Sequence, residues 1–372
     1  MRAPILALFL CFLSTGSADL VDRQCGSDLG HLWVDVVALV DTSTHMTQMD
    51  LNQVATNLES VFSAGTRIGM DPSDPRTTRV GLVTYNWDTT IVDDLNKFHN
   101  LVDLRNGVSR IKNSHSSDSN LAAGLETAWK VFNDGSRNST RLNYKRVIIV
   151  YTDYYDPQHP SARVANQLKE NGIIIITVAL SQDLEVLTTI ASRSLNFTMY
   201  DLNVVAEIQQ ALLDANCFCP LTWTRYTLRG VCVKAVPLNA VWRAARSSCQ
   251  NRMKNAYMLN EYSQEKHDFV WNMIQNTNGF SQPYAYHIGL FLSNGAWVWD
   301  QPKGFPNPPL QNWTAWDGGN PVASSSMSAV QIVQKGTISV WRNVAAMNNA
   351  AGYVCEVSAC DTDNYCEYYD DL

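Results

Sequence analysis

Residues 33–45 read Trp-Val-Asp-Val-Val-Ala-Leu-Val-Asp-Thr-Ser-Thr-His, and this stretch decides the fold of the first half of the chain. Its first eight residues are almost continuously apolar, which is typical of a parallel strand covered on both faces. Polar residues from Asp41 to His45 follow at the point where such a strand would end. Because parallel sheets bind ligands beyond the carboxyl ends of their strands, these polar residues are candidates for a functional site.

Strand-like and helix-like segments alternate across residues 31–215. Apolar residues recur at helical spacing from Leu51 to Phe62. The other predicted elements are strands at 80–85, 147–151 and 173–179 and helices at 121–132 and 204–213. Alternation of strands and helices predicts an α/β domain with a doubly wound, mainly parallel sheet.

Three loops at the expected strand ends carry side chains with oxygen atoms. Asp41 and Ser43 follow the first strand, Ser119 precedes a predicted helix, and Asp153 follows a middle strand. This set resembles the metal-ion-dependent adhesion site of the von Willebrand factor type A (VWA) domain, which uses D-x-S-x-S, a Thr and an Asp. Ser119 stands at the Thr position, and His45 replaces the second Ser of the motif.

The resemblance implies that Asp41, Ser43, Ser119 and Asp153 hold a divalent cation. Mg²⁺ is the expected ion, because it prefers hard oxygen ligands and keeps several waters. A carboxylate of a partner protein would then complete the coordination shell of the cation, which is how members of the family commonly bind proteins. The imidazole of His45 is a softer ligand that suits Zn²⁺ or Cu²⁺ better. The alternative is a loop without metal, in which these residues only cap the backbone and start a turn.

The composition of the chain changes near residue 216. Of the cysteines after residue 18, only Cys25 precedes residue 217, and eight of the eleven tryptophans follow residue 220. The second half is therefore predicted to be a separate module that contains disulfides. A join of only a few residues connects the two halves at Cys217-Phe218-Cys219-Pro220.

Five short motifs follow one another in this second half. They are Cys-Pro-x-x-Trp at 219–223, Trp-x-x-Ala-x-x-x-Cys at 242–249, His-Ile-Gly-Leu at 287–290, Trp-x-x-Gly-x-Pro at 316–321 and Tyr-Val-Cys-Glu at 353–356. In this order and spacing they resemble the long form of the C-type lectin-like domain, over about residues 219–357. The resemblance implies an α+β fold with disulfides Cys219–Cys232 and Cys249–Cys355. A second core disulfide of the family is lost, since its positions fall near Ala329 and Ala346.

The remaining cysteines suggest two further disulfides. We expect Cys25–Cys217 to tie the ends of the VWA-like domain together, although eight cysteines allow many pairings. Cys360 and Cys366 would close a loop in the acidic, tyrosine-rich tail at residues 358–372. Disulfides of this kind form in oxidising compartments.

The lectin-like module departs from the sugar-binding members of its family. Those members hold one Ca²⁺ through an E-P-N or Q-P-D triplet and a later W-N-D. Here the triplet is Asn320-Pro321-Val322 and the later motif is Trp341-Arg342-Asn343, with no Asp or Glu between residues 320 and 343. Because Ca²⁺ takes 6–8 oxygen ligands, carboxylates prominent among them, we expect no calcium site. Asn320, Arg342 and Asn343 remain the candidate ligand-binding residues, and sugar binding by exposed tryptophan faces stays open.

The termini and the charge predict where the protein works. Residues 1–18 have the basic start, short apolar run and small-residue exit of a secretory signal peptide. No later stretch approaches the roughly 20 apolar residues of a membrane span. N-glycosylation sequons begin at Asn138, Asn196 and Asn312. The formal charge is −7 and no Lys/Arg-rich run occurs, so nucleic acid is not an expected partner.

These observations predict a secreted two-domain recognition protein. No G-x-S-x-G, P-loop or H-E-x-x-H motif occurs, so we predict no enzyme. The first hypothesis is calcium-independent binding of surface glycans or glycoproteins by the lectin-like domain. The resemblance to secreted invertebrate proteins that join these two domains implies a role in innate defence. The second hypothesis is adhesion to extracellular or matrix proteins through the metal site of the VWA-like domain.

Overall fold

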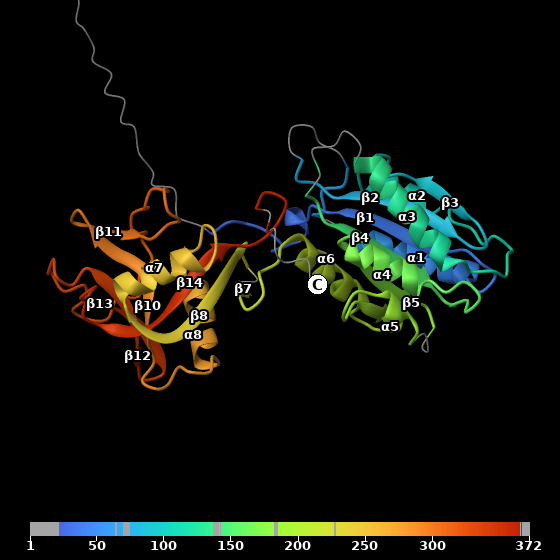
Figure 1. Cartoon of the computed structure of the whole chain (residues 1–372). Coiled ribbons are helices and arrows are strands. Elements are labelled where there is room, and N and C mark those ends of the chain that lie inside the picture. Colours follow the sequence, from blue (N-terminus) through green and yellow to red (C-terminus); the bar gives the residue numbers. More distant parts are fainter. Residues whose placement is uncertain are drawn as a thin grey trace, which may run out of the picture. The chain divides into compact units, whose positions relative to one another are not determined.

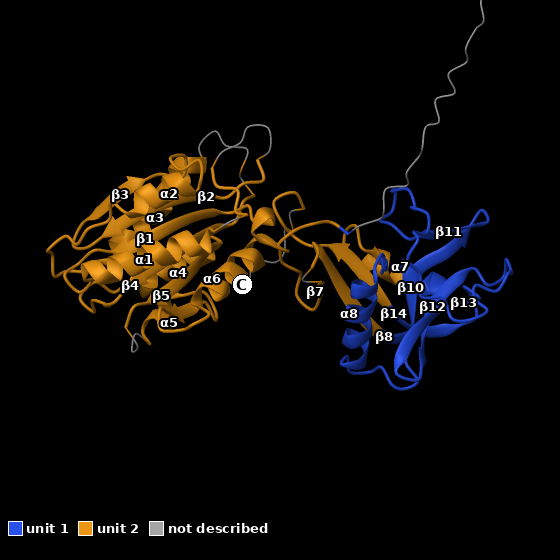
Figure 2. Cartoon of the chain, turned by 180° about the vertical axis from the view of Figure 1, so that it is seen from behind, with its two compact units in different colours: residues 1–22, 237–247, 258–353 blue, residues 23–236, 248–257, 354–372 orange. Residues whose placement is uncertain are grey.

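The computed structural model describes residues 22–63, 65–69, 75–136, 141, 143–181, 185–226, 228–364 and 366. The chain forms two compact units (Figures 1 and 2). Unit 1 consists of residues 1–22, 237–247 and 258–353, and unit 2 of residues 23–236, 248–257 and 354–372. The unit boundary therefore falls within the lectin-like segment. The expected signal peptide at residues 1–18 lies outside the described residues.

Unit 2 contains a six-stranded sheet with the strand order β3-β2-β1-β4-β5-β6. The strands are β1 (Asp35–Asp41), β2 (Arg79–Tyr85), β3 (Thr89–Asp93), β4 (Arg146–Thr152), β5 (Ile173–Ala179) and β6 (Asn196–Thr198). Strand β3 is antiparallel to β2, and all other pairs are parallel. The predicted doubly wound, mainly parallel sheet is confirmed, with β3 and β6 as additional edge strands.

Helices cover both faces of this sheet (Figure 1). Helices α1 (Gln48–Val61), α2 (Leu101–Val108) and α6 (Val204–Asn216) contribute to the apolar core on one face. Helices α3 (Leu121–Ser136), α4 (Ala162–Glu170) and α5 (Leu187–Ile190) contribute to the core on the other. Successive side chains of a strand point to opposite faces, so β1 supplies Val36 and Ala38 to the first core and Val37 and Leu39 to the second.

The one acidic residue inside the apolar stretch 33–40 has a structural role. Asp35 begins β1 and is buried, with the guanidinium groups of Arg79 and Arg141 beside it. Arg79 Nε lies 2.9 Å from Asp35 Oδ1, and Arg141 Nη2 lies 2.9 Å from the same oxygen. Because the buried charge is paired, it is tolerated at the amino end of a central strand.

The lectin-like segment is built on a second, mixed sheet. Its strand order is β13-β12-β10-β14-β8-β7, with β11 paired to β10 and β9 paired to β14. The strands are β7 (Thr224–Tyr226), β8 (Val231–Val241), β9 (Tyr257–Met258), β10 (Ala285–Ser293), β11 (Ala296–Trp299), β12 (Ala329–Lys335), β13 (Ile338–Val344) and β14 (Ala350–Ser358). Its helices are α7 (Trp242–Arg252) and α8 (Gln264–Gln275).

The Trp-x-x-Ala-x-x-x-Cys motif at 242–249 forms the greater part of α7. Its three defining residues, Trp242, Ala245 and Cys249, are all buried. The Trp242 indole donates a hydrogen bond to the Ile288 carbonyl at 2.8 Å, which joins the helix to β10. The Asn320–Pro321 peptide bond is cis. The predicted α+β fold of this segment is confirmed.

Four disulfides join the cysteine pairs that the sequence led us to expect. They are Cys25–Cys217, Cys219–Cys232, Cys249–Cys355 and Cys360–Cys366.

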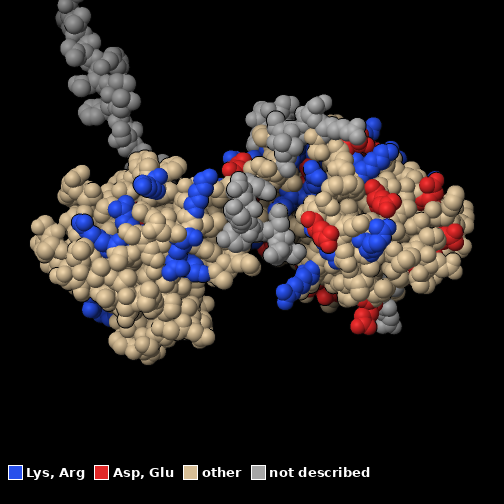
Figure 3. All heavy atoms as spheres, in the orientation of Figure 1, with Lys and Arg blue, Asp and Glu red and all other residues tan. Residues whose placement is uncertain are grey.

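Surface charges differ between the two halves of the chain. Red and blue side chains are mixed over the sheet formed by β1 to β6, whereas the visible face of the lectin-like part shows blue side chains alone (Figure 3). None of the described helices is long and apolar enough to cross a lipid bilayer.

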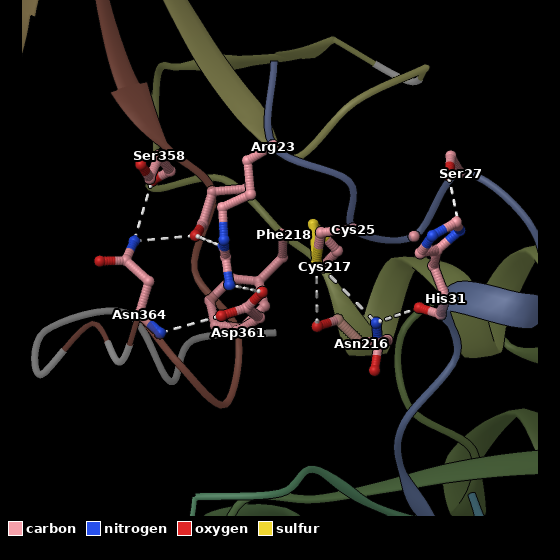
Figure 4. The surroundings of a disulfide bond; sticks show 12 residues. Arg23, Cys25, Ser27, His31, Asn216, Cys217, Phe218, Ser358, Asp361 and Asn364 are labelled. Atoms are coloured by element: carbon pink, nitrogen blue, oxygen red, sulfur yellow. Dashed lines mark hydrogen bonds and ion pairs between the residues drawn. A yellow bond between two sulfur atoms is a disulfide. The ribbon is translucent and has the colours of Figure 1, made fainter. Parts of the chain in front are cut away.

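The segments around the first disulfide are held by further bonds within unit 2 (Figure 4). The Asn216 side chain donates to the His31 carbonyl at 2.9 Å and accepts from the Trp33 amide at 2.8 Å. The Arg23 guanidinium pairs with the Asp361 carboxylate. These contacts bring the start of the described chain, the end of α6 and the C-terminal tail together at one place.

Candidate functional site

The carboxylate of Asp41 lies at the centre of the predicted metal site. Asp41 is the last residue of β1, and it is fully buried. Its Oδ2 accepts hydrogen bonds from the hydroxyls of Ser119 and Thr152, both at 2.8 Å, and its Oδ1 accepts from the Ser43 amide at 2.8 Å. The fold therefore brings the three predicted loops together. Thr152, which ends β4, was not predicted to take part.

A hydroxyl group in this cluster lacks a partner. Ser43 is buried, and its Oγ makes no hydrogen bond with the described residues. Buried polar groups in proteins nearly always have a partner, and an exception calls for an explanation such as an ion. Serine and threonine hydroxyls are hard oxygen donors that suit Mg²⁺ and similar cations.

Burial raises the pKa of two carboxyl groups in the site, Asp41 and Asp153. Burial raises the pKa of Asp41, and hydrogen bonds from the Ser43 backbone amide and from the Ser119 and Thr152 hydroxyls oppose this rise. Burial also raises the pKa of Asp153, and the negative charges of Asp50 and Asp41 add to the rise. Asp50, near the start of α1, is a second group that the sequence did not point to. A bound cation would relieve this repulsion.

His45 is held in a defined orientation beside the site. Its ring stacks on Tyr154, with centroids 3.8 Å apart and planes 16° apart. Its Nε2 lies 3.2 Å from the Ser117 carbonyl oxygen. A carbonyl only accepts, so Nε2 carries the hydrogen and Nδ1 has the lone pair in the neutral ring. Metal-binding histidines are commonly fixed in this way through their other nitrogen.

These residues fit a divalent cation. Within the described part of the chain, no three His, Cys, Asp or Glu side chains are grouped so that they could hold a metal. A cation here would depend on Ser43 and Ser119 together with water and the carboxylates Asp41 and Asp153. The unpartnered Ser43 hydroxyl and the effect of the Asp41 charge on Asp153 favour this arrangement over a loop that only caps the backbone.

In the lectin-like segment, the side chain of Asn343 is fully used by the protein itself. Its Oδ1 accepts from the Val322 amide at 2.7 Å. Its Nδ2 donates to the carbonyls of Val322 and Met327 at 2.9 and 3.1 Å. Asn343 thus fixes the loop after Pro321. Asn320, whose backbone amide donates to the Asp317 carbonyl, lies in the same loop.

Arg342 lies next to Asn343 and forms an ion pair. Its Nε and Nη2 lie 2.8 and 2.7 Å from Asp317 Oδ2. Lys335 Nζ lies 2.5 Å from the other oxygen of the same carboxylate. Hydrogen bonds from Lys335 and Arg342 lower the pKa of Asp317 to about 2. A positive charge from the protein therefore occupies the position where the family motif has an oxygen ligand.

A cluster of tryptophans lies beneath these residues. Trp299 and Trp341 are fully buried, while Trp297, Trp313 and Trp316 are partly exposed. The Trp313 and Trp316 rings both pack edge-on against Trp341, at centroid distances of 5.3 and 5.5 Å. Trp313 and Trp316 thus pack in the core and also keep some exposed surface.

A buried polar chain, which the sequence motifs did not reveal, supports this cluster. His267 Nδ1 lies 2.7 Å from Glu261 Oε2, and its Nε2 lies 2.7 Å from Ser339 Oγ. The Trp341 indole also donates to Glu261 Oε2 at 2.9 Å. Burial by itself would lower the pKa of His267, but the Glu261 charge and hydrogen bonds hold it above its ordinary value. This series of hydrogen-bonded side chains links α8, β13 and the tryptophan cluster.

The glycosylation sequons differ in their surroundings. Asn312 is exposed, whereas the Asn196 amide oxygen accepts a hydrogen bond from the Thr177 hydroxyl at 2.6 Å. Asn138 lies outside the described residues.

Comparisons with known proteins agree with this division. Residues 35–211 match the family model of the von Willebrand factor type A domain, and residues 239–357 match that of the lectin C-type domain. C-type lectin domain-containing protein 160 of Caenorhabditis elegans is 26% identical over 370 residues, which cover 92% of this chain. The chain spans 56% of the length of this curated relative.

Solved structures match each half separately. Proximal thread matrix protein 1 from the mussel byssus, with a zinc-occupied MIDAS motif, is 18% identical with a TM-score of 0.39, over 52% of this chain and 47% of that protein. The C-type lectin domain of murine dendritic cell inhibitory receptor 2, in complex with N-glycan, is 22% identical with a TM-score of 0.31, over 38% of this chain and 98% of that domain.

The combination of the two matched domains supports a role in recognition or adhesion. Both family models cover the elements that carry the two sites described above. The chain thus contains a von Willebrand factor type A domain at residues 35–211, followed by a C-type lectin domain at residues 239–357.

Proposed function

We propose that this chain is a secreted recognition protein whose C-type lectin domain binds glycans without calcium. The observation that carries this proposal is the use of the Asn343 side chain, which makes three hydrogen bonds to the backbone of Val322 and Met327. An amide oxygen that already accepts from a backbone amide is a poor ligand for an additional cation. Arg342 and Lys335 share the single carboxylate of Asp317, so a net positive charge remains that would repel Ca²⁺.

Sugar recognition would then depend on direct contacts. Trp297, Trp313 and Trp316 present partly exposed indole rings near the loop that contains Asn320. Indole faces can stack on the apolar faces of sugar rings, and the Asn320 amide can hydrogen-bond to hydroxyls. The proposed ligands are glycans or glycoproteins on microbial or host surfaces, and the proposed physiological role is innate defence. The proposed activity is binding and not catalysis.

Secretion and glycosylation belong to the same proposal. Four disulfides in the described chain suit an oxidising compartment, and the leader-like residues 1–18 would direct the chain there. The exposed Asn312 is the sequon whose side chain is most open to modification among those described.

A glycan and microbial-surface array, probed with and without EDTA, tests this function. We expect binding that EDTA leaves unchanged. Binding that EDTA abolishes in both the wild type and an Asp41→Ala variant would contradict calcium independence. Absence of binding in both buffers would contradict glycan recognition itself.

A second function is supported by the Asp41 cluster, namely metal-dependent adhesion to extracellular proteins. The unpartnered Ser43 hydroxyl is the observation that favours it. A divalent cation held by Ser43, Ser119, Asp41 and Asp153 would supply a positive centre for a partner's carboxylate. The partner class is an extracellular or matrix protein with an exposed Asp or Glu.

Binding to immobilised extracellular-matrix proteins in Mg²⁺, and separately in Zn²⁺, tests this second function. Asp41→Ala and Asp153→Ala should abolish binding, whereas the control Glu170→Ala, at an exposed residue that ends α4, should not. Equal binding by all of these variants would exclude the Asp41 cluster as the adhesion site.

A further inference from the structure

We infer that the C-type lectin domain selects acidic glycans, meaning polysaccharides that carry sulfate or uronic acid groups, through the exposed cations Arg342 and Lys335. This inference rests on the proposed function that the domain binds glycans, and it names their chemical class. It follows from how charge is distributed along the chain and between the surface and the interior of the domain.

The lectin segment is cationic although the whole chain is acidic. Residues 219–357 contain eleven Lys and Arg but only six Asp and Glu, a formal charge of +5. The whole chain carries −7, so the remaining residues carry −12. A charge contrast of this kind between parts of one chain points to a polyanionic partner for the basic part.

Burial strengthens this contrast at the surface. Four of the six acidic side chains are buried, namely Glu261, Asp300, Asp317 and Glu356. The two exposed ones, Glu265 and Asp268, both belong to helix α8. In contrast, Arg243, Lys303, Lys335 and Arg342 are exposed. The face visible in Figure 3 accordingly shows basic side chains without an acidic one among them.

Arg342 and Lys335 form the best-defined part of this cationic surface. Both pair with Asp317, so two positive charges share one carboxylate and a net positive charge remains. Their side chains are 46% and 56% exposed, and the Asp317 side chain is 8% exposed. The shared carboxylate holds the two cations in place while their outer surfaces stay available to solvent.

Aromatic rings next to these cations favour a sugar as the carrier of the negative charge. Trp316 immediately precedes Asp317, and its ring packs against Trp297 at a centroid distance of 5.3 Å. Both rings are partly exposed. A pyranose ring on an indole face would place its sulfate or carboxylate substituents near Arg342 and Lys335. Guanidinium and ammonium groups bind such anions through charge-assisted hydrogen bonds.

Binding of the secreted full chain to immobilised dextran sulfate and to uncharged dextran tests the inference. We expect binding to dextran sulfate, weakening with added salt, and no measurable binding to dextran. The double variant Lys335→Gln, Arg342→Gln should lower the affinity for dextran sulfate about tenfold. The matched control Lys97→Gln, Lys130→Gln removes two exposed cations from the VWA domain and should leave the affinity unchanged. Thermal unfolding of each variant checks that it is folded.

Four results would overturn the inference in distinguishable ways. Equal binding of dextran and dextran sulfate would show that charge is not selected, while glycan binding itself would stand. Loss of affinity in the control variant would show that the net charge of the protein, and not the surface around Arg342 and Lys335, determines the affinity for dextran sulfate. Competition by single-stranded DNA as effective as that by soluble dextran sulfate would exclude a sugar-specific surface. Failure to bind these polymers and every glycan of the array would remove the proposed function together with the inference.

Discussion

The two loop regions of this molecule balance their charges in opposite ways. In the VWA domain, Asp41 and Asp153 lie among other negative charges, and the Ser43 hydroxyl lacks a partner among the described residues. In the lectin domain, Arg342 and Lys335 neutralise Asp317. A cation taken from solution would neutralise the negative charge of the first region. In the second region, basic side chains of the protein itself do this.

The two regions also differ in how they depart from the metal motifs that they resemble. The Asn343 side chain holds the lectin loop through its hydrogen bonds to Val322 and Met327. The exchange to Arg342 replaces an oxygen ligand by a cation, so the loop keeps its form without a metal ion. In the VWA domain, the exchange to His45 adds a nitrogen donor beside oxygen donors, which would alter the choice of metal.

The largest expected effect concerns the loop that Asn343 holds. Asn343→Ala removes three hydrogen bonds and leaves backbone groups of Val322 and Met327 without their partner. We expect a loss of about 3 kcal/mol in the free energy of unfolding, at roughly 1 kcal/mol for each bond. Urea unfolding of the lectin domain signal, with Ca²⁺ and with EDTA, measures it. The control Asn320→Ala should cost less than about 0.5 kcal/mol.

Stabilisation of the wild-type lectin domain by calcium would contradict the conclusion that its loop is held without a metal ion. A lower urea midpoint in EDTA than in Ca²⁺, present in the wild type and absent in Asn343→Ala, would show that Asn343 binds the ion.

A smaller effect concerns the identity of the metal in the VWA domain. His45→Ser restores an oxygen ligand, so it should lower the affinity for Zn²⁺ and raise that for Mg²⁺, each by about tenfold. Calorimetric titration of the protein with each ion measures both affinities. Tyr154→Leu, which removes the ring stacked on His45, is a companion variant that should weaken Zn²⁺ binding alone. Unchanged affinities in His45→Ser would exclude His45 from the site.

The smallest effect concerns the buried His267. The pKa of His267 is raised in the folded protein, so the folded protein binds the proton more tightly than the unfolded chain does. Protonation of His267 therefore stabilises the folded state. The stabilisation is fully present below about pH 6.5, the ordinary pKa of histidine, and is lost as the pH rises through the raised value. The groups that face His267 are Glu261, Ser339, Trp313 and, through its charge, Asp268.

Unfolding by urea at a series of pH values from 5.5 to about 9 measures this dependence. The wild type should become less stable as the pH rises over this range. His267→Asn should be less stable at the acidic end, and its stability should change less with pH. An equally steep dependence in the variant would place the titrating group elsewhere.

Most of the fold could be predicted because its signals are local. The buried strands from β1 to β5 are continuous apolar runs, apart from β3, and α1 and α3 have clear helical spacing. The edge strands β3 and β6 were not predicted, because a half-exposed edge strand has no such run. The lectin domain was recognised by motifs, not by periodicity.

The sites could be predicted only in part. Asp41, Ser43, Ser119 and Asp153 could be singled out because a known motif uses such residues on three loops at strand ends, and their role as metal ligands stays a prediction. Thr152 and Asp50 join them through the tertiary fold. The Glu261–His267–Ser339 chain depends on residues up to 78 positions apart, which no local pattern connects. The basic character of the lectin segment was visible in the sequence, but the net charge of −7 conceals it.

The disulfides have a consequence for limited proteolysis of this protein. Cys25–Cys217 and Cys249–Cys355 enclose loops with sequence separations of 192 and 106 residues. A protease that cuts once inside either loop leaves both products covalently joined, so the binding surfaces stay on one molecule. A single cut separates the two domains only at Phe218 or in the stretch between Cys232 and Cys249. A protease whose first cut falls inside one of these two loops would therefore nick the protein without releasing a fragment.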